Sequence, residues 1–197
     1  GEDKKVEYEI PQFSQADVAV AALLQYICGV LVEEALKHVK KDKSHLRRIA
    51  PTHLYQAIQM NSELKTRFLV DLKHFAEETD VSYENNVPIN DKELNAFVEK
   101  DFGKHVMLTP KAKNALYYFL LRTYVTTLTT SFYLLKFSGR GSLRPSAILT
   151  SVDIHFSDKI AKKAYNFVSE CCQLQQTEDD KGDEYDDDPS VADEDED

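Results

Sequence analysis

Residues that interrupt or cross-link a chain are scarce in this 197-residue sequence. It has only 6 Gly and 6 Pro, so helix is the expected element. Its three cysteines, Cys28 and the adjacent Cys171 and Cys172, give no disulfide framework and fit a reducing compartment. No unbroken apolar run reaches the roughly 18 residues of a membrane span, and the N-terminus lacks the apolar core of a signal peptide. The sequence predicts a helical protein without a secretion signal or a membrane anchor.

Signs of catalysis and of metal binding are also missing. The histidines at positions 38, 45, 53, 74, 105 and 155 show no metal-ligand spacing and no neighbouring nucleophile. No strand is predicted before Gly139-Arg140-Gly141, so this segment is unlike a phosphate-binding loop. We therefore expect no enzyme activity, no cofactor and no metal. His53, close behind Pro51, is expected to make a structural hydrogen bond, the alternative being a ligand.

Acidic residues are concentrated at one end of the chain. Residues 177–197 hold 13 Asp and Glu against one Lys, a net charge of −12, whereas the rest carries 23 basic and 21 acidic residues. This segment has no periodicity and a single aromatic residue, Tyr185, so it is predicted to be a disordered acidic tail. The remainder of the chain is nearly neutral.

Two long amphipathic helices are predicted. Between residues 16 and 39 apolar residues recur at three- and four-residue steps, with Ser14 as the N-cap. The second runs from Pro110 to about residue 137, capped by Thr109, and its Thr-rich middle (123–130) has poor helix propensity, so tertiary packing must hold it. Shorter helices are expected at 51–60, 62–75, 91–102, from 145 onward, and from 157 or 158 to about 172.

Each long helix is followed by a loop and then by a helix that begins with proline. The amino-acid sequences of these segments resemble those of two core histones. Ala21-Ala22-Leu23-Leu24-Gln25-Tyr26, followed by Arg48-Ile49-Ala50-Pro51-Thr52-His53-Leu54, resembles histone 2A. The segment 139–152, with Lys159-Ile160-Ala161-Lys162-Lys163-Ala164 after it, resembles histone 2B. The chain is similar to the histone doublets of large DNA viruses. The resemblance implies an all-α fold in which two histone folds form an intramolecular histone 2A–2B-like pseudo-dimer.

The resemblance also divides the chain into segments. These are an N-terminal extension (1–13), a histone 2A-like fold (14–76), a docking segment or linker (77–90), a histone 2B-like fold with a C-terminal helix (91–176) and the acidic tail (177–197). Histone folds have a short helix before the first long one. The residues before 14 contain Pro11 and no clear period, so that helix is either absent or lies before this sequence.

Basic loop residues are the candidate functional groups. In a histone pair the loop after each long helix lies beside the partner's first loop, and its cations and helix starts contact DNA phosphates. The resemblance implies this role for Lys43, His45, Arg47, Arg48, Lys104, Lys111, Arg140, Ser142 and Arg144. The alternative is that these side chains only solvate exposed loops.

Protein partners are implied as well. Residues 80–88 are similar to the docking segment of histone 2A, so Val81, Tyr83, Val87 and Pro88 are expected to contact a histone 3–histone 4-like doublet or tetramer; the alternative is a plain linker. The acidic residues around Tyr185 resemble segments by which histone chaperones cover DNA-binding surfaces. Histone chaperones are therefore also expected partners. Tyr185 is expected to anchor a tail that covers the chain's own DNA-binding surface; the alternative is a tail that only increases solubility.

Two functions follow from these residues. The first is a DNA-packaging histone doublet that binds phosphates without reading bases and joins a histone 3–histone 4-like partner in nucleosome-like particles. Its place is the nucleus and chromatin, or a virion and viral factory, and no small molecule or membrane is expected as a partner. The second is a non-packaging histone-fold adaptor, or chaperone-like module, that binds other histone-fold proteins; the near-neutral body and the acidic tail favour it.

Overall fold

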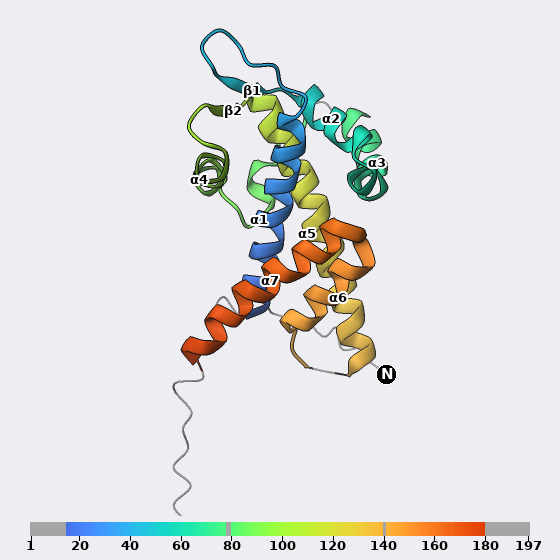
Figure 1. Ribbon diagram of the computed structural model, residues 1–197. Helices are drawn as coiled ribbons and strands as arrows, with labels where there is room; N and C mark the ends of the chain where they lie inside the picture. The colour runs from blue at the N-terminus through green and yellow to red at the C-terminus, as the bar shows by residue number, and fades with distance from the viewer. Residues whose placement is uncertain (1–14, 78–79, 140, 180–197) are drawn as a thin grey trace, which may run out of the picture.

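The structure, a computed structural model, describes residues 15–77, 80–139 and 141–179 and is mostly helical (Figure 1). Its elements are α1 (Gln15–Leu36), β1 (Arg47–Ile49), α2 (Pro51–Met60), α3 (Ser62–Glu77), the 3-10 turn η1 (Glu84–Asn86), α4 (Asp91–Phe102), β2 (Val106–Leu108), α5 (Pro110–Ser138), α6 (Pro145–His155) and α7 (Asp158–Asp179). The predicted helices are all present. The two short strands are an addition to the all-α expectation.

Helix α1 lies at the centre of the fold. Twelve of its 22 residues are buried, because it packs against α2 and against α4, α5, α6 and α7. A helix that is apolar on most sides needs such surroundings. By length and composition α1 could cross a membrane, which was not predicted from the sequence; 56% of its most apolar window is buried inside the protein.

Helix α5 is held by its ends and by its packing. Thr109 caps it by accepting a hydrogen bond from the backbone N of Ala112 at 3.1 Å. It ends at Gly139, whose φ of 67° lies in the left-handed region that favours glycine. Within the Thr-rich middle, Thr123 and Thr127 are buried, and the Ser151 hydroxyl of α6 donates to the Thr127 carbonyl at 3.5 Å. Tertiary packing holds this stretch, as the sequence predicts.

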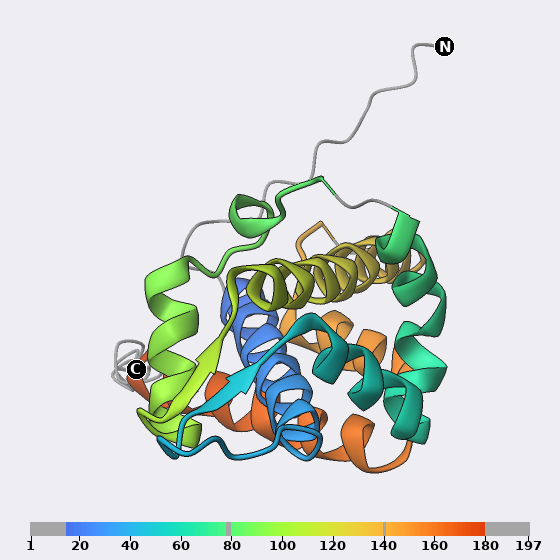
Figure 2. The same ribbon diagram turned by 90° about the horizontal axis from the view of Figure 1, so that it is seen from above.

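The two long helices run in opposite directions. β1 follows α1 and β2 precedes α5, and the two strands pair in parallel, with Arg47 opposite Val106. The end of α1 and the start of α5 therefore lie at the same end of the molecule (Figure 1). At the other end, Gln15 at the start of α1 lines a hollow with Arg144, which follows α5. Seen from above, the two helices cross (Figure 2).

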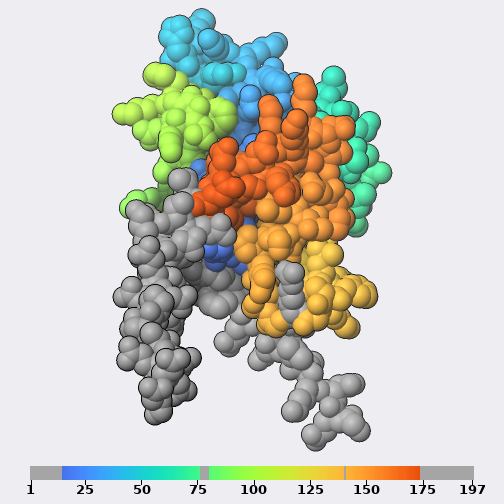
Figure 3. Space-filling view, turned by 60° about the horizontal axis from the view of Figure 1, so that its bottom comes forward, coloured from blue at the N-terminus to red at the C-terminus, as the bar shows by residue number. Residues whose placement is uncertain are grey.

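The two halves of the chain share one hydrophobic core. α7 lies across α1 and beside α6 (Figure 3). Buried residues of the first half, such as Leu23 and Phe68, belong to the same cluster as Phe119 and Val168 of the second half. Each half thus covers apolar surface that the other leaves open.

Some predicted boundaries are wrong. α1 ends at Leu36, three residues before the predicted end at residue 39. The chain continues in a turn, in which the backbone N of His38 donates to the Ala35 carbonyl at 3.0 Å. α7 continues to Asp179, into the segment assigned to the acidic tail from residue 177. The predicted N-cap Ser14, the extension 1–13 and residues 180–197 lie outside the described residues.

Candidate nucleic-acid interface

The loop between α1 and β1 is organised by Asp42. Its Oδ1 accepts hydrogen bonds from the Ser44 hydroxyl (2.6 Å), the Ser44 backbone N (2.9 Å) and the Leu46 backbone N (3.0 Å). The pKa of Asp42 lies below its ordinary value, chiefly because its carboxylate accepts the hydrogen bond from the Ser44 hydroxyl. His45 has a φ of 62°, in the left-handed region. Lys43 and His45 are therefore exposed on an ordered loop.

Arg47, a predicted phosphate ligand, makes a hydrogen bond within the fold. Its Nη2 donates a hydrogen bond to the Leu36 carbonyl at 2.6 Å, at the C-terminal end of α1, and the side chain is half-buried. A cation at this position faces the negative end of the helix dipole, where the Leu36 carbonyl also accepts from the backbone N of Val39 at 3.2 Å. The Arg47 backbone N also donates to the His105 carbonyl at 2.8 Å. Arg47 fastens the loop to the end of α1, and its contact with DNA phosphate stays a prediction.

Two helix starts lie side by side beyond the paired strands. Ile49 is opposite Leu108, and the backbone N of Thr109 donates to the Ile49 carbonyl at 3.0 Å. α2 then begins at Pro51 and α5 at Pro110. Because the strands are parallel, both helices start from the same end of the pair. The positive ends of two helix dipoles are thus brought together, an arrangement that favours anions.

His53 lies in the first turn of α2 and has the structural role that the sequence predicts. Its Nδ1 accepts a hydrogen bond from the backbone N of Ala50 at 2.8 Å. The ring thereby satisfies the N-cap residue of α2, which lacks a capping side chain of its own.

Exposed basic side chains lie at both ends of the paired strands. Lys43, His45 and Arg48 come from the first half, and Lys104 and Lys111 from the second. Arg48 lies opposite Met107 in the strand register. The Nζ of Lys104 is 4.0 Å from Glu99 Oε1, but both side chains are exposed, so this ion pair is weak. The structure brings together five of the six residues predicted around this loop pair as exposed groups, with Arg47 as the exception.

The third predicted loop lies elsewhere. Ser142 and Arg144 are exposed at the end of the molecule opposite the β1–β2 pair, where Arg144 precedes Pro145 as the N-cap residue of α6. They are separated from Lys43 and Arg48 by the length of α5. Arg140 lies outside the described residues.

The predicted docking segment is folded onto its own chain. Tyr83 and Val87 are buried, and the Tyr83 ring packs against Phe75 and Tyr118 with centroid separations of 6.1 and 5.0 Å. Asn114 of α5 accepts from the Tyr83 backbone N and donates to the Val81 carbonyl, each at 2.8 Å. The expectation that Tyr83 and Val87 contact a partner is therefore wrong.

Only Val81 and Pro88 of the four predicted docking residues are exposed. The segment between them includes a 3-10 turn, Glu84–Asn86, so it is not extended throughout.

The sequence analysis missed an exposed apolar stripe on α5. Val125, Tyr133 and Phe137 are 41, 61 and 85% exposed; Tyr133 and Phe137 are four residues apart and lie on one face, and Val125 lies two turns earlier in the helix. On the adjoining α6, Ile154 is 56% exposed, next to His155, whose ring contacts the Thr130 hydroxyl. The four-residue spacing of Tyr133 and Phe137 is a signal in the sequence that could have predicted this exposed face.

Two further electrostatic links were not predicted, because each includes residues far apart in sequence. The Glu63 carboxylate accepts from the backbone N of Lys159 (3.0 Å) and of Ile160 (2.9 Å), so α3 caps α7. Glu63 therefore does not act as a free surface acid. Asp71 of α3 binds Arg67 of its own helix and Arg122 of α5.

Comparisons with known proteins give no match: no family model fits the chain, and neither curated proteins nor solved structures resemble it significantly.

Proposed function

We propose that the chain is a DNA-packaging histone doublet, in which a histone 2A-like and a histone 2B-like fold form one intramolecular pair. The observation that carries the proposal is the parallel β1–β2 pair. It joins the loop after one long helix to the loop before the other and sets the starts of α2 and α5 beside each other. Exposed Lys43, Arg48 and Lys111 lie in the paired strands or close to their ends. Such a site neutralises phosphates and reads no bases.

An exposed cation at the far end of α5 supports DNA bending. Ser142 and Arg144 lie at the far end of α5, whose 29 residues span roughly 43 Å at 1.5 Å per residue. One turn of DNA is about 34 Å long, so the two ends of the molecule lie somewhat more than one helical turn of DNA apart. Binding at both ends bends DNA by backbone contacts and deformability, with no base-specific contact.

A histone 3–histone 4-like partner is proposed to cover the apolar stripe on α5 together with Ile154 of α6. The exposed aromatic side chains Tyr133 and Phe137 are of the kind that anchor protein interfaces. This assignment replaces Tyr83 and Val87, which are buried in the chain's own core.

Reconstitution tests the proposal. The full chain is mixed with histone 3–histone 4 tetramer and with DNA of about 150 base pairs, and nuclease protection is measured across a salt series. We expect protection at low salt that is lost at lower salt than for a cellular nucleosome, because few cations hold the DNA. Absence of protection at every salt concentration, with any such tetramer, would refute packaging.

The second candidate function is a histone-fold adaptor that binds other histone-fold proteins and not DNA. The near-neutral body and the −12 charge of residues 177–197 favour it. Substituting Arg48 and Arg144 with Ala separates the two functions. A packaging protein loses DNA affinity, whereas an adaptor keeps its protein partners and shows no DNA binding to lose.

A further inference from the structure

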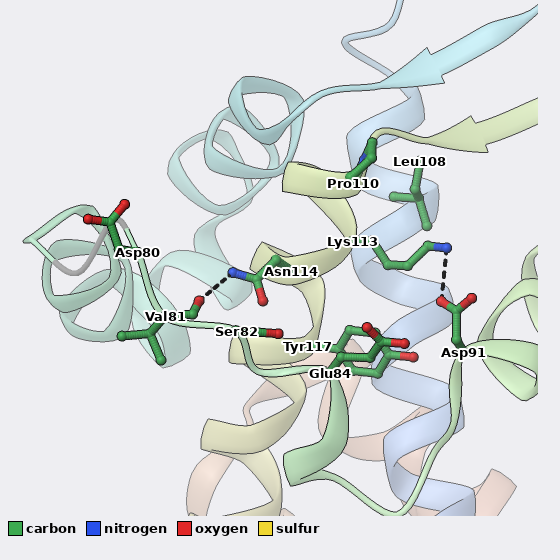
Figure 4. Close-up of a pocket in the computed structure, with 10 residues that line it drawn as sticks. All are labelled: Asp80, Val81, Ser82, Glu84, Asp91, Leu108, Pro110, Lys113, Asn114 and Tyr117. Atoms are coloured by element: carbon green, nitrogen blue, oxygen red, sulfur yellow. Dashed lines mark hydrogen bonds and ion pairs between the residues drawn. The ribbon is translucent and has the colours of Figure 1, made fainter.

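A polar pocket with a volume of about 420 Å³ lies between α5 and the segment that precedes α4. Residues 80–84 form one wall, the first turns of α5 form another, and Asp91 at the start of α4 closes it (Figure 4). The Asn114 bonds to residues 81 and 83 hold the outer wall in place. Leu108 and Pro110 supply apolar surface at its rim. The pocket is therefore shaped by hydrogen bonds and by the α5 backbone.

Tyr117 lies at the floor of this pocket and carries an unsatisfied hydroxyl. The residue is 1% exposed, and its hydroxyl oxygen has no hydrogen-bond partner among the described residues. The ring points from α5 toward Glu84 and Asp91 (Figure 4). A buried hydroxyl without a partner costs about 1–3 kcal/mol, so a ligand that supplies a partner gains binding energy there.

The charges around the hydroxyl are mostly negative. Asp80, Glu84 and Asp91 line the pocket against one cation, Lys113. The Nζ of Lys113 lies 2.9 Å from Asp91 Oδ1, and its side chain is 24% exposed. Burial, and then the carboxylates of Asp91 and Glu84, raise the pKa of Tyr117, so its hydroxyl stays protonated. The net negative charge favours a cationic ligand.

We propose that this pocket binds a guanidinium or primary ammonium group carried on an alkyl stem. The cation pairs with Asp91, its N–H donates to the Tyr117 hydroxyl oxygen, and the stem lies along Leu108 and Pro110. A metal ion is a poorer occupant, because within the described ranges no group of three or more His, Cys, Asp and Glu is placed to hold one. Lys113 occupies part of the site as an internal cation, and the ligand displaces it from Asp91.

Two kinds of ligand carry such a cation: a free amine, and an Arg or Lys side chain of another protein. The site is independent of DNA binding, so its failure leaves the packaging proposal unaffected. The ¹⁵N-labelled full chain is titrated with agmatine, with N-acetyl-arginine amide and with neutral butylurea, and the backbone and side-chain amide shifts of Val81 and Asn114 are followed. We expect saturable binding of at least one cation and none of butylurea. Binding by the capped arginine indicates a protein source, and binding by agmatine alone indicates a free amine.

Four variants fix the location. Tyr117→Phe removes only the hydroxyl and should weaken binding about threefold to tenfold, the range for one hydrogen bond. Asp91→Asn should weaken it at least as much. Lys113→Gln should tighten it, because it frees Asp91 and removes a like charge. Asp153→Asn, an exposed acid on α6, is the matched control and should change nothing.

Tyr117→Phe and Lys113→Gln each leave Asp91, the first residue of α4, unchanged, so the test does not depend on the Asp91 variant folding. Unchanged affinity in both, equal binding of butylurea, or no saturable shift with either cation would overturn the proposal.

Discussion

Substitution of Asp71 should destabilise the protein more than any other single loss of charge. Asp71 is 6% exposed; its Oδ2 lies 3.2 Å from Arg67 Nη1 and its Oδ1 3.1 Å from Arg122 Nε. The Arg67 side chain is 11% exposed, its guanidinium lies 5.0 Å from the centre of the Phe68 ring, and burial lowers its pKa. In Asp71→Ala this cation stays buried without its carboxylate, which costs about 3 kcal/mol.

The assay is urea unfolding followed by circular dichroism. Asp71→Ala should lower the midpoint without changing the slope, and lower Tm by roughly 6–12 °C for a protein of this size. Arg122→Gln should cost less than about 1 kcal/mol, because the Arg122 side chain is 43% exposed. The double variant Arg67→Met, Asp71→Leu should recover most of the loss, because no buried charge is left alone. A cost below about 0.5 kcal/mol for Asp71→Ala would refute this account of the α3–α5 link.

Three further predictions concern other parts of the chain. Glu63→Ala removes the cap of α7 and should cost about 1 kcal/mol, measured by urea unfolding, with Glu63→Gln losing less because it keeps one acceptor; equal stability of Glu63→Ala and the unmodified protein would contradict the capping role. Burial, and then Arg67, hold the pKa of His155 below 6.5, so the unfolded chain binds the proton more readily. The free energy of unfolding should therefore fall as the pH drops below about 6.5. His155→Gln should reduce this pH dependence between pH 7.5 and 5.5, and an identical dependence in the variant and the unmodified protein would disprove the role of His155. Tyr185→Ala keeps every charge of the acidic segment and should tighten DNA binding and raise the NMR mobility of residues 180–197, whereas no change in either leaves the segment as a charge reservoir only.

The helices were predictable because their signals are local. Pro51, Pro110 and Pro145 each mark the first residue of a helix, and the three- and four-residue apolar steps define the length of α1 to within three residues. Thr109 caps α5 as its sequence position suggests. Such features depend on a few neighbouring residues, and no tertiary information is needed to see them.

The roles of individual charged residues were less predictable, because they depend on contacts across the fold. Nothing near Arg47 in the sequence shows that its guanidinium meets the Leu36 carbonyl, eleven residues away. Glu63 reaches amides 96 and 97 residues further on. Residues 80–88 were predicted to be a docking segment or a plain linker, whereas Tyr83 is buried in the chain's own core and its backbone N donates to Asn114.

The salt dependence of DNA affinity tests the central proposal most directly. Binding of the full chain to a DNA duplex of about 30 base pairs is measured between 50 and 200 mM salt. The variant Lys43→Gln, Arg48→Gln, Lys111→Gln is compared with Lys65→Gln, Lys73→Gln, Lys162→Gln, which removes the same charge from exposed positions on α3 and α7.

Each phosphate contact contributes about 0.9 to the slope of log K against log salt. The first triple variant should therefore bind more weakly with a slope smaller by about 2.7, and the second should keep the slope of the unmodified protein. Equal slopes in the two variants, or no DNA binding by the unmodified protein at the lowest salt, would contradict the assignment of DNA contacts to the β1–β2 end of the molecule.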